Sequence, residues 1–252
     1  MIAVLDYGSQ YCHLVARRIR ALGVYAEIFP NTVTDAELKA RKVEGIILSG
    51  GPRSVYENNA PTIDKRIFSL RVPILGVCYG HHLLAHVLGG KVVYGSKEYG
   101  KEIFTVAKKT RLLNGLGKKE QVWMSHGDSV ISLPQGFAVS GRTPGCKIAA
   151  YADEKRRIYG VQFHPEVQHT LHGMRILENF LKICGCKKTS SIRGLDKKLV
   201  AGIKATVGNE AVIMGVSGGV HSLVASALIK RATPNIHCLF VDHGIIRKGE
   251  AE

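Results

Sequence analysis

Short apolar segments alternate with helical segments along the first third of this chain, and this alternation constrains its fold more than any other feature. The expected strands span residues 2–6, 24–29, 45–51 and 72–78, and the expected helices span 9–23, 34–42, 60–71 and 80–90. Because unbroken apolar strands are buried on both faces, the pattern predicts an α/β fold with an open, mostly parallel sheet and flanking helices. Ligands bind to such sheets at the carboxyl ends of the strands. Four residues of interest are expected at that edge: Asp6, Gly50, Gly51 and Cys78.

Residues 91–150 follow a different pattern, in which short alternating segments are separated by Gly, Pro and Asp. This pattern is typical of antiparallel hairpins, so we expect an antiparallel β insertion with a break between two strands near Gly127. A buried strand over 158–163 and an amphipathic helix over 170–184 follow. The first domain is therefore predicted to span 1–184.

The rest of the sequence opens with a polar stretch, "GCKKTSSI", which predicts a linker over 185–192. A helix, a strand, the turn "SGGVHS", another helix and another strand follow, and they predict the start of a second α/β domain over 193–252. A single β-α-β unit has few neighbours to bury its faces. We therefore expect this second domain to be incomplete in the 252 residues.

The chain carries a formal net charge of +15, but its basic residues occur in scattered pairs without interleaved aromatic residues. This distribution favours a solvated surface that attracts anionic metabolites such as nucleotides, and we expect no nucleic-acid partner. No apolar run approaches the roughly 18 residues of a membrane span, and no signal peptide is evident, so we expect no membrane partner. The six cysteines lack C-x-x-C spacing, which predicts reduced thiols, a cytoplasmic location and no metal site.

Cys78 lies between an apolar strand and a helical segment in the stretch "LGVCYGHHLLAH". Gly76 and Gly80 flank it as G-x-C-x-G, the thiol counterpart of the nucleophile elbow G-x-S-x-G. A residue on such a turn is exposed at the sheet edge, and the helix N-terminus behind it favours a thiolate. The alternative is that Cys78 is a small buried core residue, which is the common role of an isolated cysteine.

A nucleophilic cysteine also needs a base, an orienting group and donors for the oxyanion. "FHPEV" places His164 just past a strand, with Glu166 two residues further on, where it can orient the imidazole. The glycine turn "LSGGP" and the amide of Tyr79 supply candidate oxyanion donors. The helix that follows Cys78 carries its side chains away from the elbow, so His81 and His82 are not expected to act as the base. Together these features favour the nucleophile over the core residue.

Five segments, "LDYGSQY", "IILSGGPRSV", "GVCYG", "VWMSHGD" and "IYGVQFHPEVQHT", together resemble the class I glutamine amidotransferase domain of GMP synthetases (glutamine-hydrolysing). The resemblance covers nearly all of residues 1–184, and "KEYG" at 97–100 adds to it. It implies a flavodoxin-like fold, a triad of Cys78, His164 and Glu166, and hydrolysis of glutamine through a thioester without a cofactor. It further implies an oxyanion hole at Gly51 and Tyr79, and glutamine contacts at His82, Ser125, His126, Gly127 and Asp128.

His82 departs from the family pattern, which has Gln at this position and uses it to hold the substrate amino acid. An imidazole offers fewer donor and acceptor options than an amide. We therefore expect a weakened affinity for glutamine rather than loss of the chemistry.

The turn "SGGVHS" resembles the pyrophosphate loop of ATP pyrophosphatases, whose domain is of the adenine nucleotide alpha hydrolase-like type. Strand–glycine turn–helix units suit phosphate chains because backbone N–H groups and the helix dipole face the ligand. The implied ATP-binding residues are Ser217, Gly218, Gly219, Val220, His221 and Ser222. His221 replaces the family's Asp, which removes a carboxylate beside a phosphate and Mg²⁺ site.

The resemblance as a whole implies that ATP and Mg²⁺ serve the synthetase domain, where xanthosine monophosphate (XMP) is adenylylated and then aminated to GMP. It also implies that full-length members form homodimers. Two alternatives remain open: a glutaminase subunit for another acceptor, as in anthranilate or carbamoyl-phosphate synthesis, and a catalytically impaired remnant that acts as a binding module.

Overall fold

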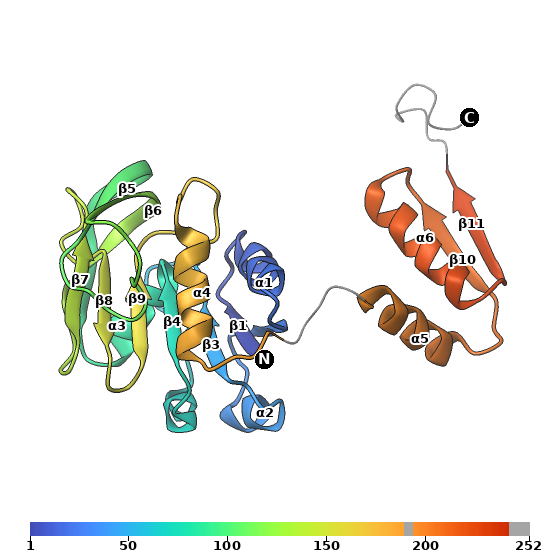
Figure 1. The fold of residues 1–252 in the computed structure, drawn as a ribbon, viewed down its shortest axis with the longest axis horizontal. Helices are drawn as coiled ribbons and strands as arrows, with labels where there is room; N and C mark the ends of the chain where they lie inside the picture. Colours follow the sequence, from blue (N-terminus) through green and yellow to red (C-terminus); the bar gives the residue numbers. More distant parts are fainter. Residues whose placement is uncertain (189–193, 242–252) are drawn as a thin grey trace. The chain divides into compact units, whose positions relative to one another are not determined.

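The structure, a computed structural model, describes residues 1–188 and 194–241, which form two compact units, Met1–Ser190 and Ser191–Glu252 (Figure 1). The predicted linker lies partly outside the described residues, as do residues 193 and 242–252 of the predicted second domain. The predicted domain limits therefore stay predictions.

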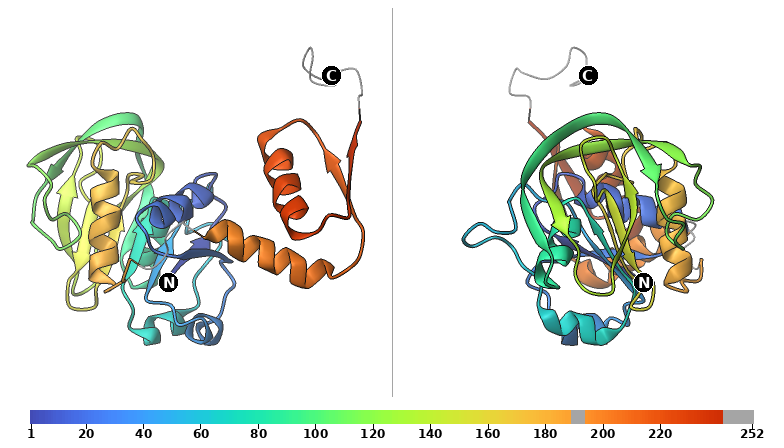
Figure 2. Two further views of the ribbon diagram at one scale, coloured as in Figure 1. Left: turned by 45° about the vertical axis from the view of Figure 1, so that its right-hand side comes forward. Right: turned by 90° about the vertical axis from the view of Figure 1, so that its left-hand side faces the viewer.

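Unit 1 is built on a nine-stranded sheet with the order β2-β1-β3-β4-β9-β8-β7-β5-β6. Its strands are β1 (Ile2–Asp6), β2 (Ala26–Pro30), β3 (Gly45–Leu48), β4 (Ile74–Val77), β5 (Lys91–Val106), β6 (Lys119–Ser132), β7 (Ala138–Arg142), β8 (Ala150–Asp153) and β9 (Ile158–Val161). The five strands from β2 to β9 in this order are parallel, and those from β8 to β6 pair antiparallel. The expected α/β fold is confirmed, and the antiparallel strands extend the same sheet. Figure 2 shows β5 and β6 as a long curved ribbon.

Helices cover both faces of the parallel part of the sheet. They are α1 (Cys12–Ala21), α2 (Asp35–Ala40), the 3₁₀ helix η1 (Lys65–Leu70), α3 (Tyr79–Val87) and α4 (Gly173–Ile183). One core cluster joins α1 and α4 to alternate residues of β1, Ile2 and Val4. The other joins α2, η1 and α3 to Ala3 and Leu5. Because successive side chains of a strand point to opposite faces, β1 must be apolar at every one of these positions.

Three local predictions are wrong. The helix expected over 60–71 is only the 3₁₀ turn η1, because Asp64 caps it by accepting from the Arg66 N–H, and Arg71 ends it with a φ of 53°. Ser9 is not a helix N-cap, since α1 begins at Cys12 and no side chain caps it. The break expected near Gly127 is absent, because β6 runs unbroken through this point and the irregularity lies in β5, between Tyr94 and Glu98.

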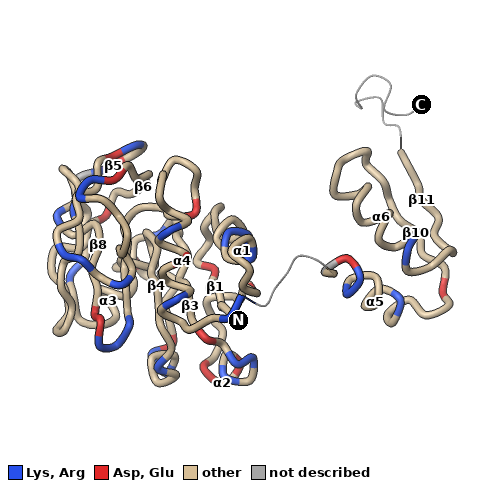
Figure 3. The backbone as a smooth tube through the Cα atoms, in the orientation of Figure 1, with Lys and Arg blue, Asp and Glu red and all other residues tan. Residues whose placement is uncertain are grey.

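Unit 2 consists of α5 (Leu195–Val207), β10 (Val212–Val216), α6 (Val220–Ala232) and β11 (Ile236–Phe240), with the two strands paired in parallel. Thr233 is its only buried residue among those described. Lys and Arg are distributed over the described parts of both units and are interspersed with Asp and Glu (Figure 3). No helix in the described part of the chain is long and apolar enough to span a membrane.

Candidate active site

Cys78 occupies a sharp turn between β4 and α3, with backbone angles of φ 51° and ψ −101° that are unusual for a residue with a side chain. The two flanking glycines are required by close packing. A Cβ on Gly76 would lie 2.4 Å from the carbonyl oxygen of Gly80, and one on Gly80 would lie 2.5 Å from that of Leu48. The Cys78 N–H donates to the carbonyl of Val161 at 2.9 Å, which ties the elbow to the end of β9.

His164 and Glu166 follow β9 and lie at the same sheet edge as Cys78. His164 Nδ1 is 2.7 Å from Glu166 Oε1, and both side chains are almost fully buried. Burial disfavours the charged imidazole, but the negative charges of Glu166 and Cys78 outweigh it and raise the pKa of His164 well above its usual range. The His164 N–H donates to the Trp123 carbonyl on β6 at 3.0 Å, so the antiparallel strands also hold this residue in place.

A cavity of about 420 Å³ opens in front of the Cys78 thiol. Most of the predicted amidotransferase residues line it: Gly51, Cys78, Tyr79, His82, Ser125, His126, Gly127, Asp128 and His164. Glu166 does not line the cavity but bonds to the imidazole of His164. Tyr94 and Tyr99, which were not predicted from the sequence, also line the cavity from β5. Their signal was their position on either side of "GSKE", in the segment that contains the "KEYG" motif.

Gly51 and Tyr79 both border the cavity beside Cys78. A Cβ at Gly51 would lie 2.5 Å from the carbonyl oxygen of Tyr7, so only glycine allows the backbone this close approach. Among the described residues, neither the Gly51 N–H nor the Tyr79 N–H donates to another backbone group. Both donors are therefore available for an oxygen that develops negative charge near the thiol.

The segment 125–128 on β6 forms the wall of the cavity opposite the elbow. Cys78 Sγ lies 3.5 Å from the Ser125 carbonyl oxygen, a contact in which the neutral thiol form of Cys78 donates. Tyr56 donates to Asp128 Oδ1 at 2.8 Å and so fixes a carboxylate at the cavity surface. A carboxylate there suits a cationic amino group.

His82 is buried on α3, and its Nε2 lies 2.6 Å from Gln162 Oε1. Burial lowers the pKa of His82 to about 4, although the contact with Gln162 favours the charged form. The ring is therefore neutral at physiological pH. Gln162 was not predicted from the sequence, although it lies in the segment "IYGVQFHPEVQHT" two residues before His164.

Comparison with known proteins bears on this geometry. The family described as "Glutamine amidotransferase class-I" matches residues 3–184. The chain belongs to this family.

Proteins named GMP synthase [glutamine-hydrolyzing] from Geobacillus kaustophilus and Listeria monocytogenes are 49% and 48% identical to this chain over its whole length. The chain covers 50% and 49% of them, so it spans about half the length of the curated relatives it matches. A crystal structure from Thermoplasma acidophilum, described as that of a GMP synthase subunit, is 33% identical with a TM-score of 0.65. That match covers 78% of this chain and 96% of the other. The predicted resemblance is therefore confirmed.

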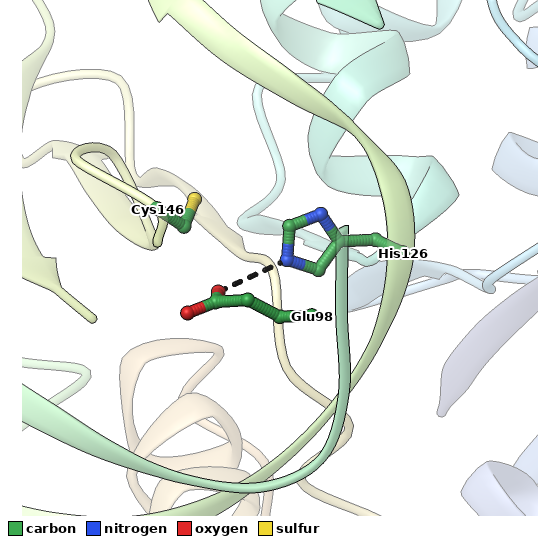
Figure 4. Close-up of side chains that lie close together, drawn as sticks. All are labelled: Glu98, His126 and Cys146. Atoms are coloured by element: carbon green, nitrogen blue, oxygen red, sulfur yellow. Dashed lines mark hydrogen bonds and ion pairs between the residues drawn. The ribbon is translucent and has the colours of Figure 1, made fainter. Parts of the chain in front are cut away.

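A second buried cluster adjoins the cavity, because its member His126 also lines the cavity. Figure 4 shows the side chains of Glu98, His126 and Cys146. Their possible metal-ligand atoms all lie within 4.8 Å of one another. The Glu98 carboxylate already accepts from Thr143 Oγ1, from the Gly145 N–H at 2.9 Å and from His126 at 3.2 Å. These contacts tie β5 to β6 and to the loop before β8, and they satisfy the carboxylate without an ion.

The loop Ser217–Ser222 of unit 2 joins β10 to α6, which is the expected strand–turn–helix placement. The Ser217 N–H donates to Ser222 Oγ at 3.3 Å, and Ser222 Oγ donates to the Gly219 carbonyl at 2.8 Å. Gly218 has a φ of 74°, which glycine adopts readily. The residues of this loop include no carboxylate.

Proposed function

We propose that unit 1 hydrolyses glutamine to glutamate and ammonia, with Cys78 as the nucleophile. The observation that carries this proposal is the convergence of Cys78, the His164–Glu166 pair and two available backbone donors on one cavity of about 420 Å³. These groups come from the ends of three parallel strands, β3, β4 and β9.

In the first half of the reaction, the Cys78 thiolate attacks the side-chain amide carbon of glutamine. The N–H groups of Gly51 and Tyr79 stabilise the resulting oxyanion. The His164 imidazolium, oriented by Glu166, gives its proton to the departing nitrogen, so that ammonia leaves and a thioester forms.

In the second half, a water molecule attacks the thioester, and His164 accepts the proton that the water loses. Glutamate then leaves, and the Cys78 thiolate paired with the His164 imidazolium is restored. We assign Asp128 to the substrate α-amino group and leave Ser125, His126, Gly127 and His82 as the other predicted glutamine contacts.

We further propose that the ammonia serves ATP-dependent amination of XMP to GMP, in purine nucleotide biosynthesis. The support is the identity with proteins named GMP synthase over the whole chain, unit 2 included. In this proposal unit 2 belongs to an ATP pyrophosphatase domain, Ser217–Ser222 hold the phosphates, and the full-length protein is a homodimer. ATP supplies the leaving group that activates the acceptor.

The test is glutamate release from glutamine by the full chain, measured with and without ATP and XMP. The Cys78→Ala variant should hydrolyse glutamine at least about 1,000-fold more slowly, because no thioester can form without the thiol. Cys184→Ala, at the end of α4 and away from the cavity, is the matched thiol control and should retain the rate. Equal rates for Cys78→Ala and the parent chain would overturn the proposal.

A further inference from the structure

Gln162 is a fully buried polar residue beside the nucleophile that the mechanism above does not use. Two backbone hydrogen bonds fix its position: its own N–H donates to the Ala149 carbonyl at 2.8 Å, and the Cys78 N–H donates to Val161 at 2.9 Å. Its side-chain nitrogen lies 3.9 Å from Cys78 Sγ, and its oxygen lies 2.6 Å from His82 Nε2. The amide thus bridges the histidine and the reacting sulfur.

The direction of this amide follows from charge. A glutamine amide has a donor end and an acceptor end. A carbonyl oxygen turned toward a thiolate would be repelled by it, whereas an N–H group donates to it. The thiolate is the form in which Cys78 reacts in the proposed mechanism. The Gln162 nitrogen therefore faces the sulfur, and its oxygen faces His82.

The contact between the Gln162 side-chain oxygen and His82 supports the same orientation of the amide. A carbonyl oxygen 2.6 Å from a ring nitrogen requires a proton between them, since both atoms otherwise present lone pairs. The neutral His82 carries one proton, and this contact places it on Nε2. An aliphatic residue at position 82 would leave the amide of Gln162 free to turn over.

We propose that Gln162 is a catalytic residue whose amide N–H holds and stabilises the Cys78 thiolate, and that His82 is the positioning residue that fixes the direction of this amide. This inference rests on the proposed function of Cys78 as the nucleophile. It also gives His82 a role besides the predicted contact with glutamine.

The test measures the thiolate directly, without turnover. Alkylation of Cys78 by iodoacetamide is followed in the full chain from pH 5 to pH 9, by mass spectrometry of the Cys78 peptide. Gln162→Met keeps the length of the side chain but removes the donor, and Gln162→Glu keeps the shape but adds a negative charge. Gln121→Leu is the matched control, because the Gln121 amide donates to a backbone carbonyl outside the cavity.

Gln162→Met should slow alkylation about 10-fold near neutral pH and move the half-maximal rate to higher pH, as loss of a hydrogen bond to a charged group does. Gln162→Glu should slow it further, because its charge repels the thiolate. Both variants leave the other titratable groups around the cavity in place: Tyr11, Arg53, Tyr79, His82, Tyr94, Tyr99, His126, Asp128, His164 and Glu166. Gln121→Leu should match the parent chain.

Two His82 variants separate positioning from general packing. His82→Gln offers an N–H to the Gln162 oxygen and should keep the parent pH profile, whereas His82→Leu should move it in the same direction as Gln162→Met. The inference would be overturned if Gln162→Met had the same thermal midpoint as the parent chain and also the same pH profile of Cys78 alkylation. An absence of preferential Cys78 alkylation over Cys184 in the parent chain would instead overturn the proposed function.

Discussion

The chain contains two strand–turn–helix segments of the same local design, and they differ in what surrounds them. In unit 1, β4 runs through Gly76 into the turn at Cys78 and then into α3. In unit 2, β10 runs through Gly215 into the turn at Ser217 and then into α6. All four residues of β4 and seven residues of α3 are buried, whereas α6 has no buried residue among those described.

The difference shows what makes the turn at Cys78 a site. Its partners come from far along the chain, namely Ser125 on β6 and Gln162 and His164 after β9. The described partners of Ser217 are local, since its N–H bonds to Ser222 a few residues later. A glycine turn between strand and helix is thus a local feature, and the proposed catalysis depends on the distant strands that enclose it.

The largest expected effect is a difference in cooperative unfolding between the two units. A fragment of residues 1–188 should unfold in one cooperative transition on heating, because it contains both core clusters. A fragment from residue 194 onward should show none, because Ile213, Val220 and Leu239 are 71%, 74% and 57% exposed and bury no common core. Calorimetry of the two fragments measures this, and a cooperative transition in the second fragment would contradict the comparison.

The next largest effect compares Gly76 and Gly215, the glycines that lie two residues before the turns at Cys78 and Ser217. Gly76→Ala should lower the free energy of unfolding by about 3 kcal/mol, because its Cβ would lie 2.4 Å from a backbone oxygen that cannot move cheaply. Gly215→Ala should change it by less than about 0.5 kcal/mol, since no atom lies within 4 Å of its Cβ. Urea unfolding checks both, and equal costs would show that unit 2 is packed at this turn.

A pH-dependent effect follows from the core of unit 1. His81 is fully buried on α3, and this burial holds its pKa well below the usual range. Below about pH 6.5 the unfolded chain takes up a proton that folded His81 does not. Its contribution therefore makes stability fall as pH falls, by about 1.4 kcal/mol per pH unit.

The pKa of His164 is raised, so its contribution to stability has the opposite pH dependence. This contribution is fully present below about pH 6.5 and is lost as pH rises above that value. The effect of His81 is measured by urea unfolding at pH 6.0 and pH 5.0, where His81→Leu should show a smaller loss than the parent. Replacing the exposed His13 in the same way is the control. If the loss of stability per pH unit were unchanged in His81→Leu, the acid sensitivity would come from other groups, of which His82 is the first candidate.

The smallest expected effect tests the turn of unit 2. His221→Asp should tighten Mg²⁺–ATP binding by a few-fold, because it returns a carboxylate to a loop that has none. His237→Asp, on β11 and outside the loop, is the control. Titration calorimetry with and without Mg²⁺ measures the effect, and an equal gain in both variants would make it a general charge effect.

The sequence was most informative where the structure is local. The elbow at Cys78 and the pair His164 and Glu166 were found because their glycines and strand ends are contiguous in the chain. Tyr94, Tyr99 and Gln162 were missed, because their places in the site depend on the curvature of β5 and β6 and on the pairing of β4 with β9. Neither the strand curvature nor the strand pairing can be read from the hydrophobic periodicity of a single segment.

The pairing of β4 with β9 has a kinetic consequence. These strands are hydrogen-bonded neighbours in the sheet, yet residues 78–157 lie between them in the chain and form α3 and the strands β5 to β8. Contacts that close so long a loop are costly in chain entropy and form slowly during folding. Cys78 and His164 therefore come together in one of the most non-local steps of folding, whereas the direct chain connection from β4 through Cys78 to α3 is local.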